Sequence, residues 1–261
     1  MAGTRTPPVP PATSSEVGTR LAVVVMPAYN AAATLQSTID QIPPGIVDKI
    51  ILVDDKSRDD TVQVARGLGI ETIQHPHNVG YGGNQKTCYM EALRQGADVV
   101  VMLHPDGQYD PRILGDLVDT VRSGNADLVL GSRFLLPGQA KLGGMPWWKR
   151  IANHFLTFCE NRVLGLRLSE AHTGYRAYSR RFLETVPFLR NSNDFVFDSQ
   201  VIAQAASFGL RVAEVPVSTR YFEQASSVGF RVSVVYGLKT LATLLRYQLH
   251  RMGFRSKLFT A

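Results

Sequence analysis

The stretch that decides the fold is VVVMLHPDGQYDP, residues 99–111. Its first five residues, 99–103, are all apolar, which is typical of a strand buried on both faces of a parallel sheet. The strand leads into a turn that carries His104, Asp106 and Gln108. Open α/β sheets bind their ligands at the carboxyl ends of strands. The turn is therefore a candidate site for a divalent cation held against a phosphate, and an ordinary polar corner of a sheet is the alternative.

Strand-like and helix-like segments alternate on both sides of this stretch, from residue 21 to residue 131. Such alternation predicts an α/β fold, with a mostly parallel central sheet and helices on both of its faces. The predicted strands are 21–26, 49–53, 70–74, 99–103 and 127–131, and the predicted helices are 34–42, one after Asp60, one from a glycine-rich loop through Leu93, and 111–121.

The second half of the chain has a less regular pattern. It predicts helices over 147–164 and 195–208, a short strand over 174–178, an edge strand over 210–217 with Pro216, and a last helix over 228–251. We expect a disordered tail over 1–19, rich in Pro, Thr and Ser, one folded domain over 20–227, and a basic amphipathic helix and tail over 228–261.

Composition narrows the class of protein. In 261 residues, 44% are hydrophobic and 19% are charged, which is typical of a globular protein. The two cysteines, Cys88 and Cys159, make no disulfide framework, so we expect a reducing cytoplasm, and 1–20 has no apolar core of a signal peptide.

The net charge of +6 comes from the C-terminal end. No acidic residue follows Glu223, while six Lys and Arg residues do, and the rest of the chain is balanced at 22 against 22. Basic charge confined to a tail favours peripheral contact with an anionic membrane at the inner face of the cell membrane over binding of nucleic acid. The cations are Arg231, Lys239, Arg246, Arg251, Arg255 and Lys257.

The last predicted helix is amphipathic but too interrupted by charge to cross a bilayer. It would lie on a membrane, and a core helix or a helix that packs in a homo-oligomer is the alternative. Its apolar side consists of Val232, Val235, Leu238, Leu241, Leu245 and Leu249.

Six segments in register give the chain a family resemblance. They are PAYN (27–30), VDDKSRDDT (53–61), NVGYGGN (78–84), HPDGQYDP (104–111), GSRF (131–134) and HTGYRAYSR (172–180). With them the sequence resembles a family 2 glycosyltransferase of GT-A fold, in the branch of polyprenyl-phosphate glycosyltransferases such as dolichol-phosphate mannosyltransferase.

The resemblance implies a site for a nucleotide sugar. It implies that the first loop wraps the base and ribose, that Asp55 hydrogen-bonds the base, and that the glycine-rich loop passes close to the nucleotide. Helix capping is the alternative for Asp55. The implied donor-binding residues are Pro27, Tyr29, Asn30, Asp55, Gly80, Gly82, Lys86, His104 and Asp106.

The resemblance also implies a metal, Mg²⁺ or Mn²⁺. Relatives carry Asp-any-Asp where this chain has His104, Pro105 and Asp106, so Asp106 would be the main ligand and Gln108 a second. An imidazole favours the softer Mn²⁺ if His104 is a ligand. His104 would otherwise bind the sugar or a phosphate, or simply pack.

Arginines complete the implied catalytic set, which is Asp106, Arg133, Arg176 and Arg220. Arg133 and Arg176 match family arginines that face phosphate, and Arg220 matches a segment that clamps the donor phosphates. His172 is a candidate base or distal metal ligand, Glu170 is the nearest carboxylate to it, and Asp198 is interpreted as a helix N-cap.

The function expected from the resemblance is transfer of a hexose, with inversion, from a UDP- or GDP-sugar to a polyprenyl phosphate. A phosphate acceptor is already an anion and needs no strong base. Two alternatives stay open at this point. One is a glycosyltransferase with a hydroxyl acceptor, for which Asp198, His172 or Glu170 would be the base, and the other is a non-catalytic nucleotide-sugar-binding protein.

Overall fold

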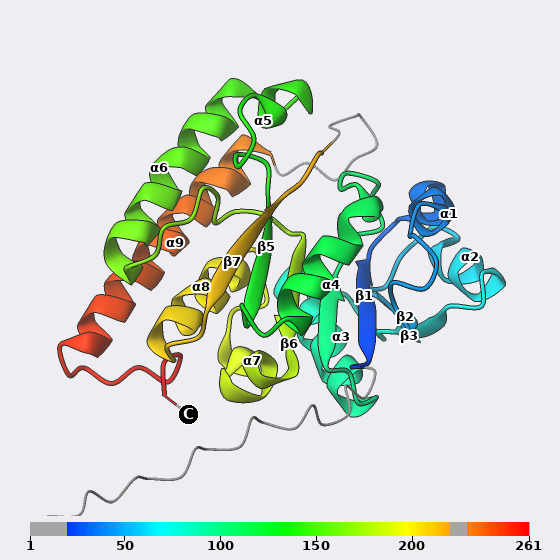
Figure 1. Cartoon of the computed structure of the whole chain (residues 1–261), viewed down its shortest axis with the longest axis horizontal. Helices are drawn as coiled ribbons and strands as arrows, with labels where there is room; N and C mark the ends of the chain where they lie inside the picture. The colour runs from blue at the N-terminus through cyan, green and yellow to red at the C-terminus, as the bar shows by residue number, and fades with distance from the viewer. Residues whose placement is uncertain (1–19, 220–228, 261) are drawn as a thin grey trace, which may run out of the picture.

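The computed structural model describes residues 20–219 and 229–260, and it contains a seven-stranded sheet. The strand order is β3-β2-β1-β4-β6-β5-β7, and four of the six neighbouring pairs are parallel (Figure 1). The strands are β1 (Ala22–Ala28), β2 (Lys49–Asp54), β3 (Glu71–Gln74), β4 (Val99–Met102), β5 (Leu128–Ser132), β6 (Arg176–Ser179) and β7 (Val212–Pro216).

Nine α-helices connect and cover the strands within the described residues. They are α1 (Ala32–Asp40), α2 (Thr61–Gly67), α3 (Tyr81–Arg94), α4 (Leu114–Arg122), α5 (Gln139–Leu142), α6 (Trp147–Leu164), α7 (Arg180–Thr185), α8 (Phe197–Ser207) and α9 (Phe230–Arg251), and the 3₁₀ turns are η1 (Pro111–Ile113) and η2 (Phe188–Arg190).

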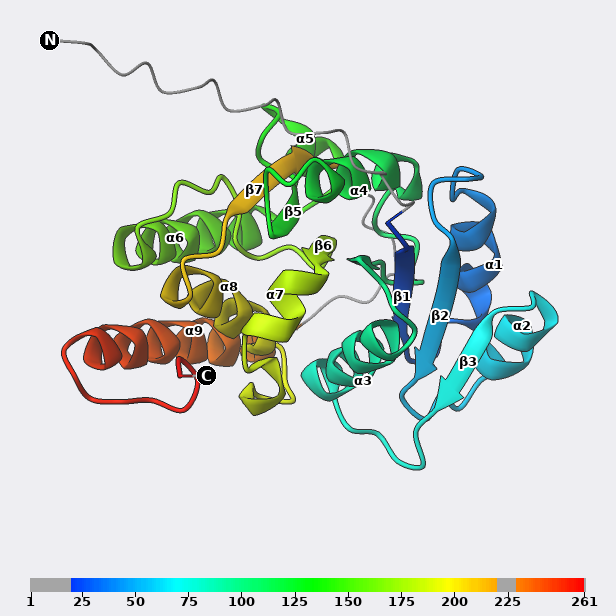
Figure 2. The same cartoon turned by 60° about the horizontal axis from the view of Figure 1, so that its bottom comes forward.

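Two apolar cores lie on opposite faces of the sheet because successive strand residues point in opposite directions. Val23 and Val25 of β1 belong to the core under α3, α7, α8 and α9, whereas Val24 and Met26 belong to the core under α1, α2 and α4. Figure 2 shows the helices arranged on both faces of the sheet. The predicted α/β architecture is confirmed.

The sheet differs from a simple parallel array at β6. This strand runs antiparallel between β4 and β5, so that Arg176 pairs with Met102 on one side and Leu130 on the other. The predicted alternation over 21–131 gave no indication of an inserted antiparallel strand, because β4 and β5 lie at its end while β6 comes more than forty residues later in the chain. Its insertion brings Arg176 beside the carboxyl end of β4.

The last helix buries a different face from the one its apolar pattern indicates. Thr240, Leu244 and Tyr247 are buried against α6 and α8. The predicted apolar side is largely exposed, with Leu238 and Leu245 more than half accessible to solvent. No helix in the described ranges has both the length and the hydropathy that a membrane span requires.

Candidate functional site

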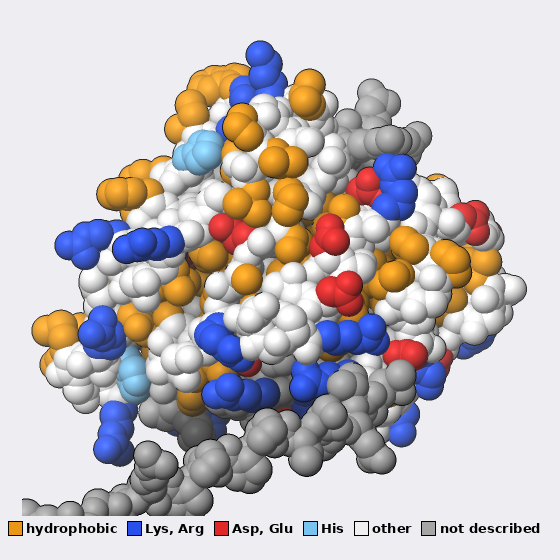
Figure 3. Space-filling view, in the orientation of Figure 1, with side chains coloured by type: hydrophobic (Ala, Val, Ile, Leu, Met, Phe, Trp, Pro, Cys, Tyr) orange, Lys and Arg blue, Asp and Glu red, His pale blue; other side chains and the backbone are white. Residues whose placement is uncertain are grey.

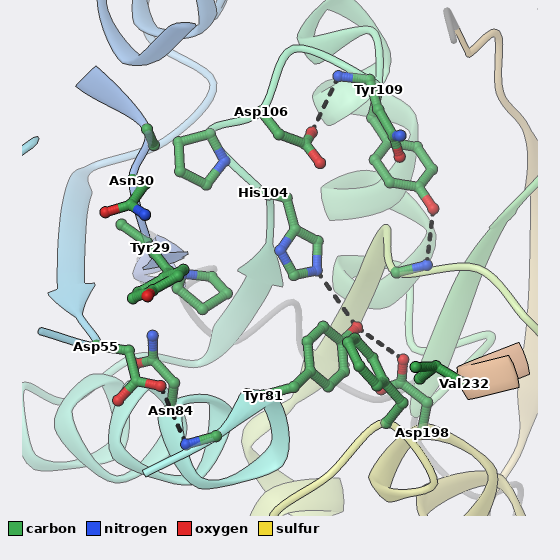
Figure 4. Close-up of a pocket in the computed structure, with 18 of the residues that line it drawn as sticks. Tyr29, Asn30, Asp55, Tyr81, Asn84, His104, Asp106, Tyr109, Asp198 and Val232 are labelled. Atoms are coloured by element: carbon green, nitrogen blue, oxygen red, sulfur yellow. Dashed lines mark hydrogen bonds between the residues drawn. The ribbon is translucent and has the colours of Figure 1, made fainter. Parts of the chain in front are cut away.

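A cavity of about 710 Å³ lies at the carboxyl edge of the sheet (Figure 4). It is bounded by the turns after β1, β2 and β4, by the start of α3 and by the start of α9. Among the predicted donor-binding residues, Pro27, Tyr29, Asn30, Asp55, Gly80, His104 and Asp106 line it, as does Gln108. Gly82, Lys86, Arg133 and Arg176 are not among its lining residues, and Arg220 lies outside the described residues.

The turn after β4 presents Asp106 to the cavity. Its Oδ1 accepts a hydrogen bond of 3.0 Å from the backbone N–H of Gln108, and Gly107 between them has a φ of +70°, which favours glycine. Thr34 donates to the carbonyl of Pro105 at 2.6 Å and fixes the turn to α1. These two hydrogen bonds therefore fix Asp106 in the turn that follows the carboxyl end of β4.

The donor set at this turn suits a cation shared with a ligand. Within 20–219 and 229–260, no group of three or more His, Cys, Asp and Glu side chains is arranged to hold a metal alone. Mg²⁺ sites commonly combine one or two carboxylates with substrate phosphates. Asp106, with Gln108 beside it, fits that arrangement.

His104 lies in the wall of the cavity. Its ring stacks on Tyr81, with centroids 5.6 Å apart, and its Nε2 lies 3.4 Å from the Tyr81 hydroxyl. Burial lowers the pKa of His104, although the carboxylates of Asp106 and Asp198 act in the opposite direction. A Cβ at Gly174 would come within 3.0 Å of Nε2, so the glycine makes room for the ring.

Asp198 is not a helix N-cap, and that interpretation was wrong. The N-cap of α8 is Val196, and the Asp198 carboxylate instead accepts a hydrogen bond of 2.8 Å from the hydroxyl of Tyr81. Gln85 also donates to it at 3.3 Å, and a guanidinium nitrogen of Arg176 lies 3.7 Å away. Asp198 lines the cavity and ties α3 to α8.

Asp55 organises the glycine-rich loop. One carboxylate oxygen accepts from the backbone N–H of Val79 at 2.8 Å, and the other accepts from Gly80 at 3.0 Å. His75 Nδ1 lies 3.0 Å from the first oxygen. Both oxygens therefore hold the protein's own loop, and a contact between Asp55 and a base stays a prediction.

Gly80 and Gly82 are required by the segment Ser192–Asp194. A Cβ at Gly80 would lie 2.7 Å from the Asn193 carbonyl, and one at Gly82 would lie 2.4 Å from the Ser192 carbonyl. The Lys86 ammonium donates to the Asn191 carbonyl at 2.5 Å and to Asn193 Oδ1 at 2.7 Å. The described contacts thus assign Gly82 and Lys86 to packing of this segment.

Replacing Gly82 with Ala is expected to destabilise the protein by about 1–3 kcal/mol, because the added methyl group would overlap backbone and the Cβ of Phe197. The matched control is Gly67→Ala in α2, where a Cβ meets no atom within 4 Å and alanine should stabilise by about 0.5–1 kcal/mol. Urea unfolding of both variants measures the difference. Equal stabilities would contradict the packing of α3 against Ser192–Asp194.

Arg133 and Arg176 lie behind the cavity. Arg133 forms a buried ion pair with Glu170, including a hydrogen bond of 2.9 Å from Nε to Oε1, and it donates to the His172 carbonyl at 2.8 Å. Arg176 is fully buried and donates to the carbonyls of Thr173 and Asp198. In this structure both guanidinium groups position the 170–173 loop, so their predicted contact with phosphate would require a rearrangement.

The first loop carries strain that its side chains offset. Asn30 has a φ of +54°, and its Oδ1 accepts from the Arg58 backbone N–H at 2.8 Å. Its own N–H donates to Ser57 Oγ at 2.8 Å. Tyr29 is half-exposed over the cavity, where its ring offers a flat surface for a base.

A group of buried polar side chains that contact His172 was missed by the sequence analysis. His172 Nδ1 lies 2.6 Å from the Tyr236 hydroxyl of α9, and Nε2 lies 3.1 Å from Glu160 of α6. The Tyr236 hydroxyl also lies 3.1 Å from Ser199 Oγ. Helical spacing within 147–164 places Glu160 on the buried side, which is the available signal that this carboxylate has an internal partner.

Together these features define an α/β protein with a ligand cavity at the carboxyl ends of its parallel strands. Residues 23–186 match the family described as glycosyl transferase family 2, and the chain belongs to that family. It is a glycosyltransferase of GT-A fold.

Curated relatives match most of the chain. The chain is 26% identical over 250 residues to the UDP-N-acetylglucosamine–dolichyl-phosphate N-acetylglucosaminyltransferase of Methanococcus voltae, covering 89% of this chain and 98% of that protein. It is 28% identical to the polyprenol monophosphomannose synthase of Mycolicibacterium smegmatis, with 77% of each chain covered.

A solved structure shares the fold. Glucosyl-3-phosphoglycerate synthase from Mycobacterium tuberculosis in complex with UDP matches with a TM-score of 0.69 at 22% identity, covering 92% of this chain and 82% of that one. The same synthase has also been solved with Mn²⁺ and UDP, and with Mg²⁺ and UDP.

Proposed function

We propose that the protein transfers a hexose from a UDP- or GDP-sugar to a polyprenyl phosphate, with a divalent cation, at the inner face of the cell membrane. The observation that carries the proposal is the position of Asp106 in the cavity at the carboxyl end of β4. The names of the two curated relatives, which act on dolichyl phosphate and polyprenol, support the acceptor class.

The donor would lie along the carboxyl edge of the sheet. Tyr29 and Asn30 would contact the base and ribose, and the diphosphate would extend toward Asp106. Mg²⁺ or Mn²⁺, held by Asp106 with Gln108 beside it, would neutralise the departing nucleoside diphosphate. His104, whose ring stacks on Tyr81, would hydrogen-bond the sugar or a phosphate oxygen.

An acceptor phosphate needs cations more than a base. Because Arg133 and Arg176 are paired internally, we look to the second cavity, of about 470 Å³. It begins at Phe134, directly after Arg133, and combines apolar walls with Lys141, Arg150 and His154. Arg150 Nε is buried and has no hydrogen-bond partner among the residues described. A guanidinium in that state suits a phosphate oxygen.

The donor is tested by the thermal shift of the protein with a panel of nucleotide sugars, with and without Mn²⁺. A ligand that binds the folded state raises the midpoint of unfolding. We expect one UDP- or GDP-sugar to raise it, and the rise should grow when Mn²⁺ is present. Equal, metal-independent shifts for every nucleotide sugar would contradict the role of Asp106.

A further inference from the structure

An apolar stripe runs along the outer side of α6. Trp147, Ile151, Phe155 and Phe158 follow helical spacing, and Trp147 and Phe158 are each 67% exposed. The opposite side of the helix, with Leu156 and Leu164, is buried. A solvent-facing stripe of large aromatic groups is unusual for an isolated soluble domain and marks an interaction surface.

A second stripe runs along α9 beside it. Phe230, Val234, Leu238, Leu245 and Leu249 are exposed. Leu238 and Leu249 lie on the side of the helix opposite the buried Thr240, Leu244 and Tyr247. The two helices pack together: the rings of Trp148 and Phe230 lie 5.4 Å apart at an angle of 72°. In both cartoon views α6 and α9 lie side by side at one end of the molecule (Figures 1 and 2).

The charge within the two segments that carry these stripes is almost entirely positive. Between Phe134 and Ser169 the only acidic residue is Glu160, which is fully buried, and none occurs in 229–260. The view in Figure 3 shows apolar and basic side chains along α6, with the acidic ones over the sheet and the helices beyond it. The exposed cations of the two segments are Lys141, Arg162, Arg167, Arg231, Lys239, Arg246, Arg251, Arg255 and Lys257.

We propose that the exposed sides of α6 and α9 together form a docking surface for an anionic bilayer. Apolar groups that insert at the headgroup boundary, flanked by cations of which Lys239 is paired with Asp194, match a surface of acidic phospholipids. Arg162 lies on the same side of α6 as the aromatic stripe, four residues after Phe158, so insertion and charge act at one place. The surface extends the membrane contact beyond the C-terminal helix to a second helix.

Docking by this face would bring the enzyme to the membrane that contains a polyprenyl phosphate acceptor. This role of the surface rests on the proposed function. The same helices reach the catalytic region: Tyr236 of α9 lines the donor cavity, and Trp147 and Ile151 of α6 line the second cavity. A bilayer beneath α6 and α9 would therefore lie next to the apolar cavity that a lipid acceptor requires.

The test is sedimentation of the full chain with vesicles of phosphatidylcholine, with and without phosphatidylglycerol, in the absence of nucleotide sugar. Parent protein should bind the anionic vesicles and release them at high salt. Phe155→Ser with Phe158→Ser should weaken binding by about tenfold or more. Arg162→Gln with Arg246→Gln should weaken it by about fivefold per cation, on anionic vesicles only.

Matched controls are Met90→Ser in α3 and Leu189→Ser in η2, which remove exposed apolar side chains elsewhere. These variants should bind vesicles like the parent. The proposal is overturned if the α6 variants bind like the parent, or if sedimentation velocity shows that this face joins two copies of the chain and vesicles stay unbound. Thermal shift with nucleotide sugar, measured on the same proteins, reports separately on the proposed function.

Discussion

The variant Asp106→Asn is expected to lose about a thousandfold in kcat/KM for glycosyl transfer, which corresponds to about 4 kcal/mol of lost transition-state stabilisation. The amide keeps the size of the side chain and one oxygen, but it removes the negative charge that would hold a cation against the diphosphate. The hydrogen bond from the Gln108 backbone to the side-chain oxygen can persist, so the turn itself should fold as before. Steady-state kinetics with the matched nucleotide sugar measures the loss.

The control is Asp119→Asn, which makes the same chemical change at an exposed position of α4 away from the cavity. It should behave like the parent protein. Activity of Asp106→Asn within a few-fold of the parent would contradict the metal role of this turn, and so would a loss that is the same with and without added Mn²⁺.

The variant Glu170→Ala is expected to destabilise the fold by about 3–5 kcal/mol, because it leaves the buried guanidinium of Arg133 without its carboxylate. That loss is a large share of the stability of a typical domain. Urea unfolding measures it where the variant folds, and Glu170→Gln supplies a milder change. The surface pair Arg180–Glu184 is the comparison: Glu184→Ala should change stability by at most about 0.5 kcal/mol.

The double variant Arg133→Met with Glu170→Leu separates pairing from packing. Removing both charges can be nearly neutral, since neither group is then left buried and unpaired. We expect it to recover much of the stability lost in Glu170→Ala. A double variant as unstable as the single one would show that the ion pair is not the cause.

The same pair has a predictable pH dependence. Burial raises the pKa of Glu170, but the charge of Arg133 and the hydrogen bonds from Arg133 and Asn153 outweigh it, so the pKa lies below its usual value. The stabilising contribution is therefore complete above the pKa of the unfolded chain and is lost as pH falls through the lower folded value. Glu170→Ala should flatten the acid side of the stability curve.

The parallel half of the fold could be predicted because its physical causes are local. Apolar runs such as those of β1 and β4, each followed by a turn and a helix, leave few arrangements other than a covered parallel sheet. The antiparallel placement of β6 could not be predicted, since it depends on long-range pairing with β4 and β5.

The site was predictable where residues follow strands. Tyr29, Asp55 and Asp106 come directly after buried strands and do meet at one edge. The partners of the charged side chains could not be predicted from the sequence. Nothing in the sequence spacing shows that Arg133 pairs with Glu170, or that the Tyr81 hydroxyl donates a hydrogen bond to the Asp198 carboxylate. These contacts join segments more than thirty residues apart.

The most direct test of the account is the product formed with two kinds of acceptor. Purified protein is incubated with Mn²⁺ and its nucleotide sugar, together with either a polyprenyl phosphate or hydroxyl compounds, and the products are identified by mass spectrometry. We expect a hexosyl polyprenyl phosphate, formed by the parent protein and nearly lost in Asp106→Asn. Glycosylation of hydroxyl compounds alone, with the polyprenyl phosphate unchanged, would contradict it.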